Sequence, residues 1–183
     1  MKNEEYTSLR AEIIGEQSSI INLLIAMYTI FVAIITFAIE KQKSFLFIPA
    51  IFITILFKLQ LLWKKTGVLR LAAYIKVYYE DKYEEINWET SIVLAEKYRG
   101  KYLKKWFRIV SIPSSKSATF LVVFAYLLNL LYIYQYGQNI SIHIVEIIFG
   151  SIGVIVSLYI DVVESCGDLK EKFIQEFEEL NKR

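Results

Sequence analysis

The sequence is poor both in residues that break helices and in residues that build disulfides or metal sites. Among its 183 residues there are one cysteine, one histidine, two prolines and seven glycines. The single cysteine, Cys166, excludes an internal disulfide and a cysteine-rich zinc site. The scarcity of proline and glycine favours long helices over a protein of strands and tight turns. These absences predict an all-α chain.

Motifs that carry catalysis or bind cofactors are missing as well. The histidine, His143, stands at one end of an apolar run and Cys166 follows the other end, so the two cannot share a zinc ion. The sequence contains no glycine-rich phosphate loop, no GxGxxG motif and no GxSxG motif. Four carboxylates between Glu80 and Glu85 are more simply explained by a solvated turn than by a metal site. We therefore expect no catalytic residue, no metal and no cofactor, and predict that the protein is not an enzyme.

What the chain does contain is apolar sequence, since 55% of its residues are hydrophobic. Four apolar runs cover Ile20–Ile39, Phe45–Trp63, Ala118–Tyr136 and Ile140–Val163. Each is about 20 residues long, which is the length that a helix needs to cross roughly 30 Å of hydrocarbon. Four such runs predict a polytopic membrane protein, because helices satisfy their own backbone groups within a bilayer.

The connections between the runs predict the topology. Runs one and two, and runs three and four, are joined by a few residues each, so the spans form two hairpins. The 64–116 segment between the hairpins holds twelve of the 21 basic residues and six acidic ones. Basic residues beside spans stay in the cytoplasm, so both hairpins turn outside and both termini are cytoplasmic. Lys41 and Lys43 in the first turn weigh against this orientation but are outnumbered. We expect a multi-pass protein of the bacterial inner membrane without a cleavable signal peptide, because an acidic stretch precedes the first run.

Helical patterns continue beyond the apolar runs. The first helix is predicted to begin near Asn3 and to run unbroken to Ile39, and the second to continue to about Tyr79. After the fourth run, an apolar stripe follows on a charged helix: Leu169, Phe173, Phe177 and Leu180. We therefore predict one domain, residues 1–183, whose four membrane helices extend into a cytoplasmic helical bundle. Phe173 and Phe177 are predicted to contact other copies in a homo-oligomer larger than a dimer.

Two stripes of small and polar residues follow helical spacing inside the membrane runs. The fourth run carries one of them: His143, Glu146, Gly150, Gly153, Ser157 and Asp161. The first run carries the other: Asn22, Ala26, Thr29, Ala33 and Thr36. Such faces either let helices pack closely or border water. For the first run we predict packing. For the fourth, packing and a pore lining stay open, and the pore lining is the functional hypothesis. Lys58, in the second run, is expected to snorkel to the cytoplasmic interface.

A mixture of bases and aromatics precedes the third run: Lys97, Arg99, Lys101, Lys104, Lys105, Trp106 and Arg108. Such a mixture can neutralise and stack on single-stranded RNA. It also suits an anchor against anionic lipid headgroups, which we favour because it requires no further partner.

The architecture, together with the cytoplasmic segment RLAAYIKVYYE at residues 70–80 and Trp88-Glu89 after it, resembles the smaller membrane accessory proteins of type VI-B CRISPR loci. The resemblance implies an oligomeric membrane pore that weakens the host membrane during phage infection, alongside an RNA-guided nuclease as partner. The ribonuclease motif described in that family is missing, because no arginine lies within 30 residues before His143. The leading hypothesis is thus a homo-oligomeric pore or channel in antiviral defence. The alternative is a membrane-tethered adaptor that recruits a cytoplasmic partner without permeation.

Overall fold

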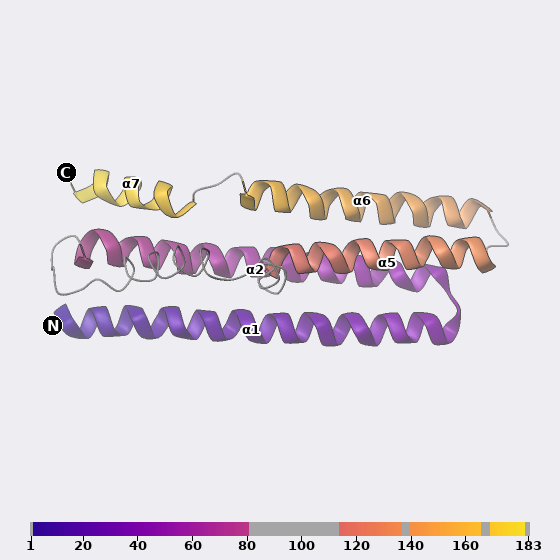
Figure 1. The fold of residues 1–183 in the computed structure, drawn as a ribbon, viewed down its shortest axis with the longest axis horizontal. Helices are drawn as coiled ribbons and strands as arrows, with labels where there is room; N and C mark the ends of the chain where they lie inside the picture. The colour runs from indigo at the N-terminus through magenta and orange to yellow at the C-terminus, as the bar shows by residue number, and fades with distance from the viewer. Residues whose placement is uncertain (1, 81–113, 137–139, 166–168, 182–183) are drawn as a thin grey trace, which may run out of the picture. The chain divides into compact units, whose positions relative to one another are not determined.

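The computed structural model describes residues 2–80, 114–136, 140–165 and 169–181, and all of these except Gln42 and Lys43 lie in helices (Figure 1). The five α-helices of the described residues are α1 (Lys2–Lys41), α2 (Phe47–Ile75), α5 (Ser114–Tyr136), α6 (Ile140–Ser165) and α7 (Leu169–Asn181). A 3₁₀ turn, η1 (Ser44–Leu46), precedes α2, and a π-helical turn, η2 (Lys76–Glu80), follows it. The all-α prediction is confirmed for this part of the chain.

Helix α1 is unbroken over 40 residues, as the sequence predicts. At a rise of 1.5 Å per residue it is about 60 Å long, twice the roughly 30 Å of a hydrocarbon core. Its end is a Schellman motif, in which the Gln42 and Lys43 backbone N–H groups donate to the carbonyls of Ile39 and Ala38. Gln42 takes the left-handed conformation that this motif requires, with φ of 51°. The chain therefore reverses between α1 and α2 without a glycine.

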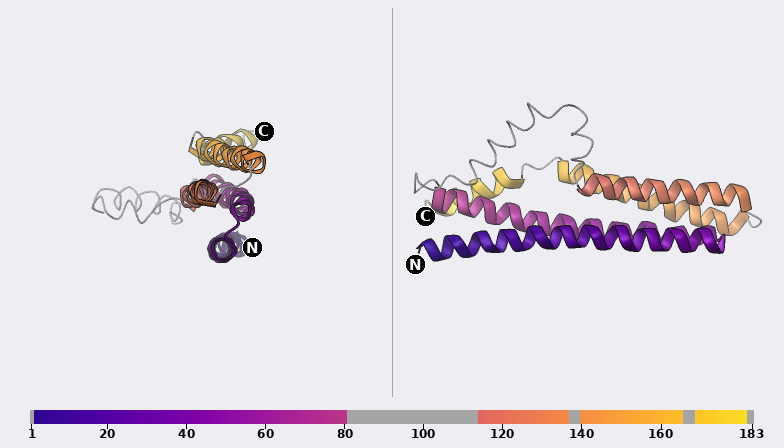
Figure 2. Two further views of the ribbon diagram at one scale, coloured as in Figure 1. Left: turned by 90° about the vertical axis from the view of Figure 1, so that its right-hand side faces the viewer. Right: turned by 60° about the horizontal axis from the view of Figure 1, so that its bottom comes forward.

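Helix α2 begins where proline permits it. Pro49 stands in the first turn, where its missing N–H costs nothing. From there the helix runs through Gly67 to Ile75 and passes into η2. Helices α5 and α6 lie side by side as the second helical hairpin (Figure 2).

The chain forms two compact units, and α1 and α2 contribute to both. The four-helix unit comprises Ile21–Leu62 and Pro113–Cys166, and the terminal unit comprises Met1–Ile20, Trp63–Ile112 and Gly167–Arg183. The core of the four-helix unit takes residues from all four of its helices: Phe31, Ile35, Ala38, Phe47, Ala50, Ile51, Ile55, Val122, Ala125 and Ile160. In the terminal unit, the rings of Tyr6 of α1 and Tyr79 of η2 are in contact in a tilted arrangement, with a centroid distance of 5.7 Å.

Four helical segments are long and apolar enough to cross a membrane: Glu4–Lys41, Ser44–Glu80, Lys116–Gln135 and His143–Glu164. The first two contain the first two apolar runs of the sequence, and the last two overlap the third and fourth runs in all but one to three residues at one end.

Candidate functional site

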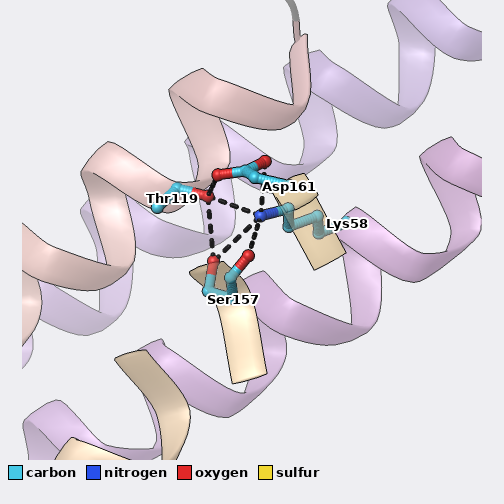
Figure 3. A network of polar contacts seen from close by, with 4 residues as sticks. All are labelled: Lys58, Thr119, Ser157 and Asp161. Carbon is cyan, nitrogen blue, oxygen red and sulfur yellow. Dashed lines mark hydrogen bonds and ion pairs between the residues drawn. The ribbon is translucent and has the colours of Figure 1, made fainter. Parts of the chain in front are cut away.

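A charged side chain is buried inside the four-helix unit, one turn before the α2 part of that unit ends at Leu62. Lys58 of α2 is fully buried, and its ammonium group lies 2.9 Å from the Asp161 carboxylate of α6 (Figure 3). Lys58 also donates to the Ser157 carbonyl and hydroxyl oxygens on α6 and to the Thr119 hydroxyl on α5. We call Lys58, Thr119, Ser157 and Asp161 the Lys58 cluster. It joins three helices through one cation.

The proton positions in this cluster follow from its partners. Thr119 donates its single hydroxyl hydrogen to Asp161 Oδ2. The Ser157 hydroxyl, 3.0 Å from Thr119, must then donate to it. Every polar group of the cluster is thus engaged, which is what makes burial of an ammonium and a carboxylate tolerable in an apolar bundle.

The expectation that Lys58 snorkels to the interface is wrong, because its side chain has no exposed surface. Asp161, one of the residues predicted as pore-lining, is its ion-pair partner inside the bundle.

A second polar cluster lies near the end of the unit where α1 turns into α2. Glu146 of α6 is buried and accepts a 3.3 Å hydrogen bond from the Asn129 side-chain amide of α5. The same amide donates to the Ser44 carbonyl of η1 at 2.9 Å. His143 Nδ1 lies 3.7 Å from Glu146 Oε2. We call Ser44, Asn129, His143 and Glu146 the Glu146 cluster.

Between the two clusters, neighbouring side chains occupy the space beside the two glycines of α6, Gly150 and Gly153. A Cβ added at Gly150 would lie 2.5 Å from the Tyr126 ring of α5, and one added at Gly153 would overlap Ile51 of α2. The Tyr126 hydroxyl lies 2.8 Å from the Ser151 hydroxyl, which fixes the ring over Gly150. The glycines therefore permit close helix packing within one chain.

The structure thus gathers the predicted pore-lining face of α6 on the inside of the four-helix unit. Glu146, Gly150, Gly153 and Ser157 are buried, whereas His143 and Asp161 are partly exposed. Whether this face ever borders water stays a prediction. The sequence analysis missed Thr119 and Asn129. Both are polar residues within the third apolar run, and that position was the signal that could have identified them.

The predicted packing stripe of α1 has the opposite placement. Asn22, Thr29, Ala33 and Thr36 are exposed, and Ala26 is half-buried. The buried residues of this part of α1 are apolar: Met27, Phe31, Ile35 and Ala38. With 3.6 residues per turn, the two sets lie on opposite sides of the helix. Four of the five stripe residues are therefore exposed in this chain, and the packing of the stripe against another helix stays a prediction.

The predicted oligomer contacts lie in the terminal unit. Phe177 of α7 packs its ring edge-on against Tyr74 at 5.6 Å and Tyr78 at 6.1 Å between centroids. Phe173 is half-buried. Phe177 therefore has partners in its own chain. The predicted lipid or RNA contacts at residues 97–108 lie outside the described residues.

Within the part of the chain that the structure describes, no group of three or more His, Cys, Asp or Glu side chains is placed to hold a metal ion. Comparisons with protein-family models, with curated proteins and with solved structures find no match to this chain.

Proposed function

We propose that the protein is a non-enzymatic, homo-oligomeric membrane pore of the bacterial inner membrane, and that the structure is its closed form. The observation that carries this proposal is the fully buried ammonium of Lys58 among four apolar helices. Ionisable groups within membrane bundles are costly and usually serve ion paths or their gates.

The membrane setting is supported by the distribution of residues on α6. Its outward face is apolar, with Ile144, Ile148, Ile155 and Val162 all at least half exposed, whereas Glu146 and Ser157 are buried. A helix on the surface of a water-soluble protein shows the reverse. Trp63 and Tyr134 are 82% and 93% exposed, as aromatic anchors at the headgroup level would be.

For the topology we propose two hairpins that turn outside, with both chain ends in the cytoplasm. The basic segment supports this orientation, because basic residues beside spans stay in the cytoplasm. The division into units supports it, because both termini fall into the same compact unit as Trp63–Ile112, which holds most of that segment.

In the proposed mechanism, the Lys58 cluster is the latch of the closed form. Lys58 ties α2 to Asp161 and Ser157 of α6, and Ile51 fills the space at Gly153 on the same interface. Parting of α6 from α2 would expose one polar face, from Glu146 to Asp161, to water. Carboxylates and hydroxyls on that face would then favour cations.

The homo-oligomer, larger than a dimer, is proposed to form along the α1 stripe. Its small residues allow close approach, and the Asn22 and Thr29 side chains can hydrogen-bond across an interface. The exposed Asn22 amide is costly against lipid, and stripes of several copies that meet around one axis offer it partners in an assembly larger than a dimer.

Ion flux through liposomes containing purified protein tests the latch. Lys58→Met and Asp161→Asn each break the ion pair, and we expect either change to raise cation flux. Combining Lys58→Met with Asp161→Leu replaces the pair by apolar contact, and flux should fall to or below that of the unchanged protein. Absence of flux from every variant that keeps its helical content and oligomer mass would exclude the pore.

Disulfide cross-linking in a Cys166→Ser background tests the oligomer. Ala26→Cys and Ala33→Cys lie on the stripe and should cross-link between copies. Val32→Cys is equally accessible at 59% exposure but lies off the stripe, and Met27→Cys is buried. Equal cross-linking at residues 32 and 33 would contradict the interface.

One observation favours a second candidate, the membrane-tethered adaptor. Tyr126 packs against Gly150 and Ile51 packs against Gly153, so both glycines on the polar face of α6 are covered by side chains of the same chain. This arrangement is what a face used for helix packing alone would show. An adaptor would keep this packing permanently and act through its cytoplasmic helices. A role in antiviral defence beside an RNA-guided nuclease stays a prediction from the resemblance, and it applies to either candidate.

A further inference from the structure

The oxygen atoms around the Lys58 ammonium outnumber its hydrogens. At least four oxygens surround it: Asp161 Oδ1 at 2.9 Å, the Ser157 hydroxyl at 3.1 Å, and the Ser157 carbonyl and the Thr119 hydroxyl at 2.5 Å each (Figure 3). An ammonium carries three hydrogens, so it cannot donate a separate hydrogen bond to all four at once. A spherical ion has no such limit, because it contacts every oxygen around it equally well.

The hydrogen bonds within the cluster also direct oxygen lone pairs toward the cation. Thr119 donates its hydroxyl hydrogen to Asp161 Oδ2, and Ser157 donates its own to Thr119. Neither hydroxyl hydrogen is then directed at the Lys58 ammonium. One carboxylate, one backbone carbonyl and two hydroxyls therefore present acceptors alone, and such oxygens are the ligands that hard metal cations prefer.

We propose that the oxygens of the Lys58 cluster form a binding site for a monovalent alkali-metal cation, which Lys58 occupies in the closed form as a tethered cation. Withdrawal of Lys58 would leave the site to K⁺ or Na⁺. The Asp161 side chain is 18% exposed whereas that of Lys58 is fully buried, so an ion can reach the site from the side of Asp161. The place of this site on an ion path rests on the proposed function, but binding of the ion does not.

The charge of the cluster selects a monovalent ion. Asp161 supplies one negative charge, which the Lys58 ammonium balances with one positive charge. A divalent ion in the same place would leave a positive charge unbalanced inside an apolar unit, which is costly. The contacts at 2.9 and 3.1 Å are also longer than the roughly 2.3–2.6 Å of Ca²⁺ or 2.0–2.1 Å of Mg²⁺. In K⁺ channels, protein oxygens replace the hydration shell of the ion in a comparable way.

Removal of the lysine side chain beyond Cβ tests the site directly. Lys58→Ala deletes Cγ, Cδ, Cε and the ammonium, and n-propylammonium contains the same set of heavy atoms. We expect KCl or NaCl, substituted for choline chloride at constant ionic strength, to raise the thermal midpoint of Lys58→Ala in detergent. Above the dissociation constant, the rise should be roughly 3–5 °C for each tenfold increase in the ion. Propylammonium chloride should act in the same way. The unchanged protein should not respond, because Lys58 occupies the site.

Two double variants serve as controls. Lys58→Ala with Asp161→Asn removes the negative charge, and its midpoint should be the same in KCl and in choline chloride. Lys58→Ala with Thr119→Val removes one oxygen and keeps the shape of the side chain, so its response to K⁺ should be weaker. CaCl₂ and MgCl₂ at the same ionic strength should raise the midpoint of Lys58→Ala less than KCl does.

Three results would overturn the inference. A response of Lys58→Ala to propylammonium but not to K⁺ or Na⁺ would mean that the cluster accepts ammonium groups alone. An equal response to K⁺ when Asp161 is replaced by Asn would be a general salt effect. A stronger response to Ca²⁺ would assign the site to divalent ions. If Lys58→Ala folds in none of these salts, Lys58→Gln, whose side chain is one atom shorter than that of lysine, is compared in the same salts and judged by the same results.

Binding and permeation are measured separately. A midpoint that depends on K⁺ beside an absence of ion flux from liposomes would exclude the pore and leave the cation site intact. Flux without any dependence of the Lys58→Ala midpoint on K⁺ or Na⁺ would exclude the site and leave the pore.

Discussion

The ammonium of Lys58 and the carboxylate of Asp161 lie 2.9 Å apart, although α2 and α6, the helices that carry them, are not consecutive in the chain. The pair is the one place in the described residues where a fully buried cation meets a carboxylate. Such a pair stabilises a bundle little relative to apolar packing, but loss of one partner is expensive. Stability should therefore depend on keeping both charges or neither.

Removal of one charge from this pair should destabilise the four-helix unit strongly. We expect Asp161→Asn to lower the free energy of unfolding by about 3–5 kcal/mol, because Lys58 then stays buried without its carboxylate. The double variant Lys58→Met with Asp161→Leu should lose much less than the sum of the single changes. Titration with SDS in mixed micelles, followed by helicity, measures these values. Additive losses would mean that the two residues are not coupled.

The two glycines on the inner face of α6 should tolerate no side chain. A methyl group at Gly150 meets Cδ2 and Cε2 of Tyr126 at 2.5 and 2.7 Å, and the ring is held by Ser151. We expect Gly150→Ala and Gly153→Ala each to cost about 1–3 kcal/mol through overpacking. Thermal unfolding in detergent measures the effect.

Matched controls exist within the same chain. Gly15 and Gly67 also lie inside helices, and an added Cβ meets nothing within 4 Å at either. Alanine there should stabilise by up to about 1 kcal/mol, because it has the higher helix propensity. Adding Ile51→Ala to Gly153→Ala should recover part of the loss. Destabilisation at all four glycines would contradict the packing explanation.

The spacing of apolar residues and the lack of helix breakers predicted the helices well, but they could not show what each helix face contacts. The continuity of α1 follows from apolar periodicity and from the lack of proline and glycine near its middle. The helical period also shows that Glu146, Gly153 and Ser157 share one face. It does not show whether that face meets water, another copy or the same chain. Here Ile51 and Lys58 of α2 cover it.

The candidate site depends on contacts between distant segments. Lys58 and Ser157 are 99 positions apart, and Thr119 and Asp161 are 42 positions apart. Because Lys58 is near the end of a span, its ammonium could have reached the interface, and no residue of α2 itself argues against that position. The carboxylate that keeps it inside comes from the second hairpin. Asn129 was missed for the same reason, since its partners lie on η1 and α6.

The turn between α1 and α2 offers a stabilising change. Gln42 adopts φ of 51°, in which a side chain with a Cβ costs roughly 1–2 kcal/mol relative to glycine. We expect Gln42→Gly to raise the thermal midpoint, because the Schellman bonds at residues 42 and 43 need no side chain. Lys43 has an extended backbone with φ of −116°, so Lys43→Gly is the control. It should destabilise slightly through added backbone entropy. A gain from both changes would point to general relief of strain in the turn.

The last prediction separates two uses of Phe177, which the sequence assigns to an oligomer and the structure to its own chain. Its ring meets Tyr74 and Tyr78 edge-on, and each such pair contributes about 0.5–1.5 kcal/mol beyond the area that it buries. We therefore expect Phe177→Ala to detach α7 and make it sensitive to limited proteolysis, while the oligomer mass in mild detergent stays unchanged. Leu180→Ala on the same helix is the control, because Leu180 is 56% exposed and should matter little. If Phe177→Ala instead dissociates the oligomer while α7 stays protected, the ring acts between copies. The assembly would then rest on the terminal unit rather than on the α1 stripe.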